Sequence, residues 1–223
     1  MTTAQSIINN VARTLIDQGS NRRWADSELL DYVNEAIKAI VIFKPSAYVK
    51  TTTMTLVSGA KQVVPTDCSL LLDVSNNMGS DGVTPGRVIY LIDRRSLNES
   101  NINWRSADPN PTVYNYMYDA QVDPKVFYVY PPNTGGQVIE ILYSAIPSVI
   151  SVGDNIVLDD MYLNSIIEYV LFRAFEKDSD TPNSASRSQT HFQLFTTMLG
   201  AKVSIDQLNN PNQTAEPTIE GTK

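Results

Sequence analysis

Residues that could act as nucleophiles, bases or metal ligands are few in this chain of 223 residues. There is one histidine, His191, and one cysteine, Cys68. A catalytic serine sits on a sharp strand-to-helix turn beside its base, whereas Ser188 and Thr190 accompany His191 in an ordinary helical pattern. We therefore interpret His191 as a packing or surface residue. Cys68 precedes a run of leucines, which favours a buried and unreactive thiol.

Carboxylates at suggestive positions also have simpler interpretations. Asp159 and Asp160 stand before a helical pattern, where the helix dipole favours negative charge. Residues 73–82 begin like a calcium loop, but Met78 occupies the position that needs glycine and Thr84 the position that needs glutamate. One histidine and one cysteine exclude a zinc site built from pairs of these residues. The sequence predicts no enzyme, no cofactor and no metal, and it favours a binding or scaffold protein.

The charge distribution argues against a protein that grips nucleic acid. The formal net charge is −7, and the basic pairs at 22–23 and 94–95 are balanced by nearby acids, so no segment offers the positive charge that phosphate binding requires. Tyrosines between 113 and 130 recur at every second residue, which is typical of sheet packing; stacking on bases or sugars is the alternative. The 20 Ser, 18 Thr and 18 Asn give a polar, weakly charged surface that is open to copies or partners.

Membrane and export signals are missing from the sequence. No segment reaches the ~20 apolar residues that a bilayer span needs, and the first residues lack the basic and apolar regions of a secretory signal. With a single cysteine, the composition predicts a soluble protein without a membrane partner, made in a reducing compartment.

Helical periodicity opens the chain. Apolar residues from 7 to 16, ending with Ile16, recur at helical spacing before a stop at residues 19–21. A second helix is predicted from about Asp26 to Phe43, capped by Ala25 or Asp26 and ended by Pro45.

Two further helices are predicted towards the C-terminus. One follows Asp159 and is apolar over more than half of its circumference, so we expect it to be packed on several sides. The last, at about 187–208, carries two apolar stripes. The first stripe is Phe192, Phe195, Leu199 and Val203, and the second is Leu194, Met198, Ala201, Ile205 and Leu208. If one stripe faces the helical core, the second needs another cover, for which a neighbouring subunit, the β region and a merged broad face are the candidates.

Between the helix pairs the apolar period changes to two, as in strands. Seven short strands are predicted at 51–57, 62–64, 70–72, 87–92, 113–118, 125–130 and 138–143. Residues 73–82 are expected to form a loop, prolines to lie at strand margins, and Gly135-Gly136 to form a hairpin turn. This spacing indicates a small antiparallel sandwich or barrel.

The predicted fold class is α+β. It consists of a four-helix bundle, with two N-terminal and two C-terminal helices, an inserted antiparallel β-sandwich or barrel, and a flexible C-terminal tail. The bundle is discontinuous, from residues 1–49 and 148–208, the β domain covers 50–147, and the extended tail covers 209–223. The tail has one large apolar residue, Ile219, so alone it is expected to be disordered.

Three separated blocks within residues 5–205 resemble the phage head-to-tail adaptors, the connector proteins of short-tailed phages also called tail tubular protein A. The blocks run from Trp24 to Ala36, from Tyr128 to Pro147, and from Asp160 to Asp178. Ala25 departs from the family pattern, which usually has a Ser or Thr cap there. The motif residues, interpreted as structural, are Trp24, Asp26, Glu28, Leu29, Asn34, Pro131, Pro132, Tyr162 and Arg173.

The resemblance implies a virion protein of the neck or tail, assembled in the host cytoplasm. Twelve copies would form a homo-oligomeric ring that joins the portal protein to the tail nozzle, continues the channel for genomic DNA without binding it specifically, and helps to present tail fibres. Leu194, Met198, Ala201, Ile205 and Leu208 are then the candidates for the subunit interface. The C-terminal segment would dock on the portal through Asn209, Asn210, Pro211, Asn212, Gln213, Pro217 and Ile219.

A second hypothesis is a stand-alone binding module. Here the tyrosine-rich β-sandwich recognises a glycan or a tail fibre, with Tyr116 and Tyr118 among the contact residues. An adaptor and a glycan-binding module differ in whether the chain assembles on a portal.

Overall fold

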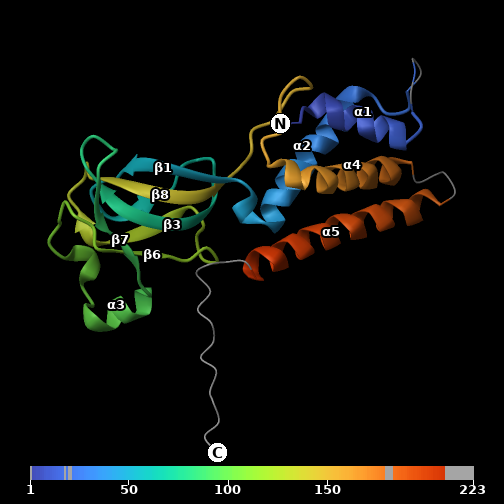
Figure 1. Ribbon diagram of the computed structural model, residues 1–223. Coiled ribbons are helices and arrows are strands. Elements are labelled where there is room, and N and C mark those ends of the chain that lie inside the picture. The colour runs from blue at the N-terminus through green and yellow to red at the C-terminus, as the bar shows by residue number, and fades with distance from the viewer. Residues whose placement is uncertain (1, 18, 20–21, 179–182, 209–223) are drawn as a thin grey trace, which may run out of the picture. The chain divides into compact units, whose positions relative to one another are not determined.

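The computed structural model describes residues 2–17, 19, 22–178 and 183–208 (Figure 1). It contains both helices and strands in quantity, which confirms the α+β class. The chain divides into two compact units, a helical unit made of Met1–Lys44 and Ile150–Lys223, and a β unit, Pro45–Val149. The tail predicted at 209–223 lies outside the described residues.

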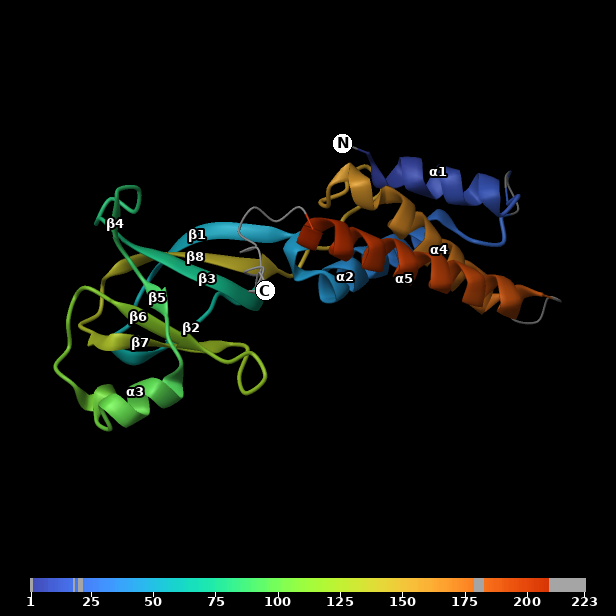
Figure 2. The ribbon, with the colours of Figure 1, turned by 60° about the horizontal axis from the view of Figure 1, so that its bottom comes forward.

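The helical unit contains α1 (Ala4–Thr14), α2 (Asp26–Phe43), α4 (Leu163–Lys177) and α5 (Ser184–Leu208), with the 3-10 turn η3 (Asp160–Tyr162) ahead of α4. α4 contacts α1, α2 and α5, as apolar residues on several of its sides require. Figure 2 shows α5 running alongside α4. α2 has the predicted bounds because its apolar spacing persists to Phe43 and Pro45 cannot continue the helix. α5 begins three residues earlier than the expected start at 187.

α1 is shorter than its apolar pattern suggests. It ends at Thr14, so the prediction that the helical pattern continues to Ile16 is wrong: Ile16 has a φ of 55° and is 91% exposed. The chain turns here because the Asp17 carboxylate accepts hydrogen bonds from the Arg23 and Trp24 N–H groups, both at 2.9 Å. This turn sets the approach to α2.

The expected side-chain cap of α2 is not formed. Ala25 holds the N-cap position, and no side chain in the described part of the chain donates or accepts a capping hydrogen bond there. Asp26 instead forms an ion pair with Arg22, four residues earlier. Asp26 and Glu28 still place negative charge in the first turn, where it favours the helix dipole.

The β unit consists of two four-stranded sheets, ordered β1-β8-β3-β4 and β2-β7-β6-β5. Buried side chains of both sheets, such as Ile141 and Phe127, join in one hydrophobic core. Pairing is antiparallel except between β5 and β6. The strands are β1 (Val49–Thr55), β2 (Gly59–Val63), β3 (Cys68–Met78), β4 (Pro85–Val88), β5 (Tyr90–Leu91), β6 (Asn115–Tyr118), β7 (Val126–Asn133) and β8 (Val138–Ala145). Short 3-10 turns lie at Pro45–Ala47 (η1) and Trp104–Ser106 (η2).

β3 overturns the prediction of a loop at 73–82, because strand continues to Met78. The polar residues of this stretch serve the sheet. Asn77 is buried, and its side-chain amide donates to the carbonyls of Arg87 (3.0 Å) and Val113 (2.7 Å) and accepts from the Val113 N–H (2.9 Å). These bonds replace the local turn that Asn and Ser otherwise favour.

The expected single strand at 87–92 is also wrong. It divides into β4 and β5, which belong to different sheets, and Ile89 between them is buried in the core. A helix that the sequence pattern did not predict, α3 (Arg94–Ser100), follows, capped by the Asp93 carboxylate, which accepts from the Arg95 N–H at 2.9 Å.

Gly135 and Gly136 do not form a hairpin turn, since β7 and β8 lie in different sheets. Both glycines have positive φ values, 92° and 88°, which suits the change of direction between the sheets. Pro131 and Pro132 lie inside β7 rather than at its margin.

Candidate interaction surfaces

The buried face of α5 is formed by Ser184, Ser188, Phe195 and Leu199. Phe195 is fully buried, and its ring lies edge-on to Tyr169 of α4 (5.2 Å between centroids) and to Phe43 of α2 (5.9 Å). Leu199 continues this face one turn later. α5 is therefore attached to both neighbouring helices along one side.

Charged groups hold the C-terminal half of α5. The Lys44 ammonium at the end of α2 is buried, 6% exposed, and forms an ion pair with Asp206, which also pairs with Lys202. The ammonium also lies over the Tyr162 ring at 5.8 Å. Burial, followed by the nearby Lys202, lowers the pKa of Lys44. The pairing fixes the last turns of α5 against the end of α2.

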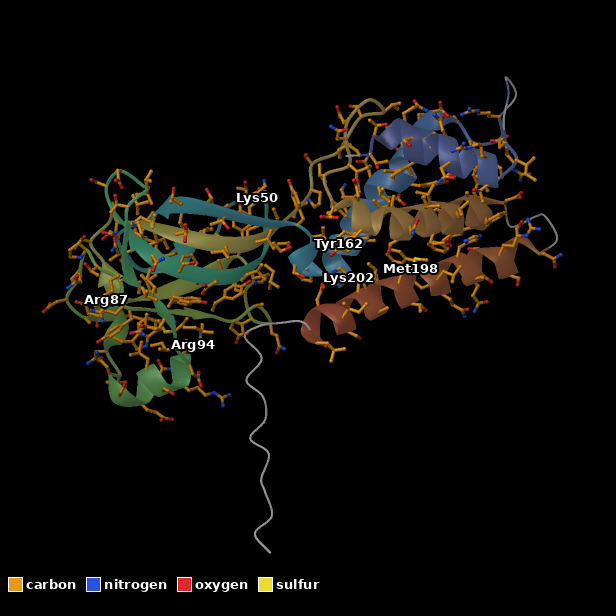
Figure 3. All side chains as sticks on the ribbon, viewed as in Figure 1. Lys50, Arg87, Arg94, Tyr162, Met198 and Lys202 are labelled. Atoms are coloured by element: carbon orange, nitrogen blue, oxygen red, sulfur yellow. The ribbon has the colours of Figure 1, made fainter. Side chains whose placement is uncertain are left out.

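The second apolar stripe lies on the surface of the described chain. Its residues recur at spacings of four, three, four and three, the heptad spacing of a helix–helix seam. Leu194 is 41% exposed, Met198 36% and Leu208 81%, and Ala201 and Ile205 are exposed as well. Figure 3 labels Met198 on α5. We call Leu194, Met198, Ala201, Ile205 and Leu208 the α5 stripe.

The first stripe does not act as one buried face. Phe195 and Leu199 are buried, whereas Phe192 is 39% exposed and Val203 is half-buried. Phe192 packs at 5.0 Å from the Phe172 ring at the margin of a groove of about 330 Å³. The groove is lined by Phe172, Phe175, Glu176, Ala185, Ser188, Gln189 and Phe192, and we call it the phenylalanine groove. Sequence reasoning missed it because it forms only where two helices meet.

His191 fastens α5 to α4. Its Nδ1 lies 2.6 Å from the Glu168 carboxylate, and its ring stacks on Phe175 at 5.4 Å. These contacts agree with the interpretation of His191 as a packing residue.

The other chemistry-bearing residues have structural partners. Cys68 is buried, and burial raises the pKa of its thiol to about 11, which suppresses the reactive thiolate. Asp159 caps η3 by accepting from the Met161 N–H at 2.9 Å. Across the described ranges, no three His, Cys, Asp or Glu side chains gather as a metal site would need.

The hydroxyl groups of the tyrosines proposed for glycan recognition form hydrogen bonds within the β unit. Tyr116 is buried, and its hydroxyl donates to the Asp73 carboxylate at 3.0 Å. The Tyr118 hydroxyl donates to the Pro124 carbonyl at 3.1 Å and accepts from the Leu71 N–H at 3.3 Å. Their main role is therefore to hold strands together.

An open cavity of about 560 Å³ lies in the β unit, beside the start of α3. Arg94, which Figure 3 labels, contributes to it. Its lining mixes charged and apolar groups: Ile92, Asp93, Arg94, Arg95, Met117, Tyr118, Asp119, Val122, Asp123, Val126 and Tyr128. Nearby, Arg105 lies 4.7 Å from the centre of the Tyr128 ring.

Two motif residues, Glu28 of α2 and Arg173 of α4, link these two helices. Glu28 accepts a hydrogen bond from the Tyr32 hydroxyl at 2.9 Å and forms an ion pair with Lys177 at 2.7 Å. Burial raises the pKa of Glu28, but the bonds from Lys177 and Tyr32 outweigh it and lower that pKa overall. Arg173 pairs with Glu35 at 3.3 Å and covers the Tyr32 ring at 5.4 Å.

Asn34 joins α2 to the chain that returns from the β unit. Its buried amide donates to the Ile150 carbonyl at 3.1 Å and accepts from the Ile150 N–H at 2.9 Å. Leu29, Trp24 and Tyr162 are buried. In the β unit, Pro132 accepts from the Asn110 N–H at 2.8 Å. The motif residues are therefore largely interior groups.

The portal-docking residues proposed in the tail, from Asn209 to Ile219, fall outside the described ranges. Among the helices that are described, none has the length and apolar character needed to cross a bilayer.

Comparison with known proteins gives a family match. The sequence matches the model of the family described as SU10 adaptor protein over residues 2–215, nearly its whole length. No curated protein matches it. The family match confirms the resemblance to phage head-to-tail adaptors that the three sequence blocks carry. The chain belongs to the SU10 adaptor protein family.

Proposed function

We propose that this chain is the head-to-tail adaptor of a phage virion, and that copies of it form a ring between the portal protein and the tail nozzle. The observation that carries the proposal is the exposed α5 stripe. Five apolar side chains at heptad spacing on a 25-residue helix are costly to leave in water, and they suit contact with another helix. Twelve copies, the number that the family resemblance implies, would continue the DNA channel.

The helical unit supplies the frame of this ring. In the proposal α1, α2, α4 and α5 act as one four-helix bundle, interrupted by the β domain at 50–147. The Lys44–Asp206 and His191–Glu168 pairs hold α5 against α2 and α4 at two points along its length. A preordered α5 loses little further entropy when a neighbour binds.

The tail is the proposed portal contact. Asn209, Asn210, Pro211, Asn212, Gln213, Pro217 and Ile219 belong to a segment of fifteen residues, which can extend up to ~50 Å. Repeated attachment around a ring would offset the entropy lost when each tail is ordered. The acidic, weakly charged composition suits a channel through which DNA slides without being held.

Electron microscopy of the chain with and without its portal tests the function. The full chain should decorate portal rings, and the truncated chain 1–208 should fold but fail to attach. A full chain that does not bind its portal at all would refute the adaptor function. Normal attachment of the truncated chain would refute only the tail contact.

A glycan- or fibre-binding role for the β unit is the alternative. The cavity beside α3 favours it, because Tyr118 and Tyr128 lie there among carboxylates and arginines. The internal bonds of the Tyr116 and Tyr118 hydroxyls weigh against it. A glycan array with no hits, together with unchanged binding after Tyr116→Ala and Tyr118→Ala, would exclude this alternative.

A further inference from the structure

We infer that the α5 stripe of one copy docks into the phenylalanine groove of the next copy, so that the subunit contact joins two different surfaces. The inference rests on the proposed ring and names the receiving surface for it. Contacts between unlike surfaces are the kind that generate rings, whereas like surfaces meeting each other close as a pair.

The two surfaces lie on opposite flanks of the same helix. At about 100° per residue, the centre of the α5 stripe lies about 180° around α5 from Ala185, Gln189 and Phe192, which line the groove. Phe195, about midway between the stripe and the groove, is buried against neighbouring helices, as is Leu199, which lies nearer to the groove side. A copy therefore presents the stripe to one side and the groove to the other.

The groove and the stripe are complementary in chemistry and size. Phenylalanine rings of α4 and α5 line the groove, and its volume of about 330 Å³ can take the ends of a leucine and a methionine. Leu194 and Met198 are such side chains, and thioether sulfur makes favourable contacts with aromatic rings. Glu176 is the one charged side chain among the groove's lining residues.

A pairing of stripe with stripe satisfies these observations less well. It would bury the heptad seam in a dimer but leave the groove and the half-exposed Phe192 in water. Leu194 and Met198 lie about 11 Å further along α5 than the groove residues of the same helix, so the unlike contact requires neighbouring copies to be displaced by about this length along α5.

Cross-linking on portal-bound rings tests the contact directly. One population carries Met198→Cys and a distinguishing tag, and the other carries Gln189→Cys. Cys68 does not compete, because it is buried and its pKa is about 11. A short bismaleimide should join position 198 of one copy to position 189 of the next, because proximity determines the cross-linking yield. This yield should be at least about tenfold higher than the yield between two copies of position 198. It should exceed by the same factor the yield between a control Thr197→Cys and position 189.

The outcomes separate the contact from the function. Rings joined from 198 to 198, or rings without either cross-link, overturn the unlike contact and leave the adaptor function standing. Absence of rings on the portal overturns the proposed function, and the contact with it.

A second measurement does not depend on the reagent. Met198→Glu charges the stripe, and Ala185→Arg fills the groove at an exposed position beside Glu176. Both should abolish rings on the portal while the circular dichroism spectrum of the monomer stays unchanged. Thr197→Glu, exposed but outside the stripe, should assemble normally. Normal rings from Ala185→Arg would overturn the inference.

Discussion

Replacing Asn34 by alanine should destabilise the helical unit by about 1.5–5 kcal/mol, since two buried backbone groups lose their partners at about 1–3 kcal/mol each and helix propensity offsets a small part of the loss. These groups are the N–H and the C=O of Ile150, at 2.9 and 3.1 Å from the Asn34 amide. The better helix propensity of alanine returns about 0.5–0.7 kcal/mol. The net loss is large because Asn34 and Ile150 are both buried where the chain returns to the helices.

The two tryptophans allow this loss to be measured in one unit alone. Trp24 belongs to the helical unit and Trp104 to the β unit, and both are buried. In a Trp104→Phe background, Trp24 fluorescence during urea unfolding should report a lower midpoint for Asn34→Ala with an unchanged slope.

Asn9→Ala is the matched control, because it makes the same substitution inside α1 at an exposed amide. It should change the free energy of unfolding by less than about 0.5 kcal/mol. A cost below about 1 kcal/mol for Asn34→Ala, or one equal to that of the control, would refute the role given to the Ile150 bonds.

Three further predictions concern pH, thiol reactivity and the β unit. Because the pKa of Glu28 is lowered in the folded chain, its contribution is complete above the unfolded value of 4.5 and is lost as pH falls through the lower folded value. Glu28→Gln should therefore weaken the fall of the urea unfolding midpoint, measured by Trp24 fluorescence, as the pH is lowered below 4.5. A pH dependence of the midpoint equal to that of the unsubstituted chain would contradict this role. The Cys68 thiol, with a pKa of about 11, should react with a disulfide reagent at pH 8 at least ~100-fold more slowly in the native chain than in urea, and comparable rates would contradict its burial. Tyr116→Phe removes the hydrogen bond to Asp73 and should lower the free energy of unfolding of the β unit by about 1 kcal/mol, measured by the fluorescence of Trp104. An unchanged free energy of unfolding would show that this bond does not stabilise the β unit.

Elements with one regular period could be predicted from the sequence. α2 keeps a helical apolar spacing from its first turn to the residue before Lys44-Pro45, so local pattern and proline together define it. The α5 stripe is another case, because five residues of one helix carry the whole signal. No partner outside these segments is needed to recognise them.

Elements that depend on a distant partner could not be predicted. The second half of β3 has turn-forming residues, yet pairing with β8 and the Asn77 bonds to Arg87 and Val113 keep it extended. The phenylalanine groove also depends on a contact between distant segments, since Phe172 and Phe192 are twenty residues apart and meet only when α4 packs on α5. Tertiary contacts override local preference at both places.

The residues that carry the family resemblance and the residues proposed for assembly occupy different parts of the helical unit. Glu28, Asn34 and Arg173 bond inside it, joining α2 to α4 and to the returning chain. The α5 stripe lies on its surface. Substitutions in the first set should therefore act through the free energy of unfolding, and charges placed in the second set should act on assembly of a folded chain. A stripe variant that unfolds the helical unit, or a motif variant that is fully stable yet fails to form rings, would show that the two sets are not separate.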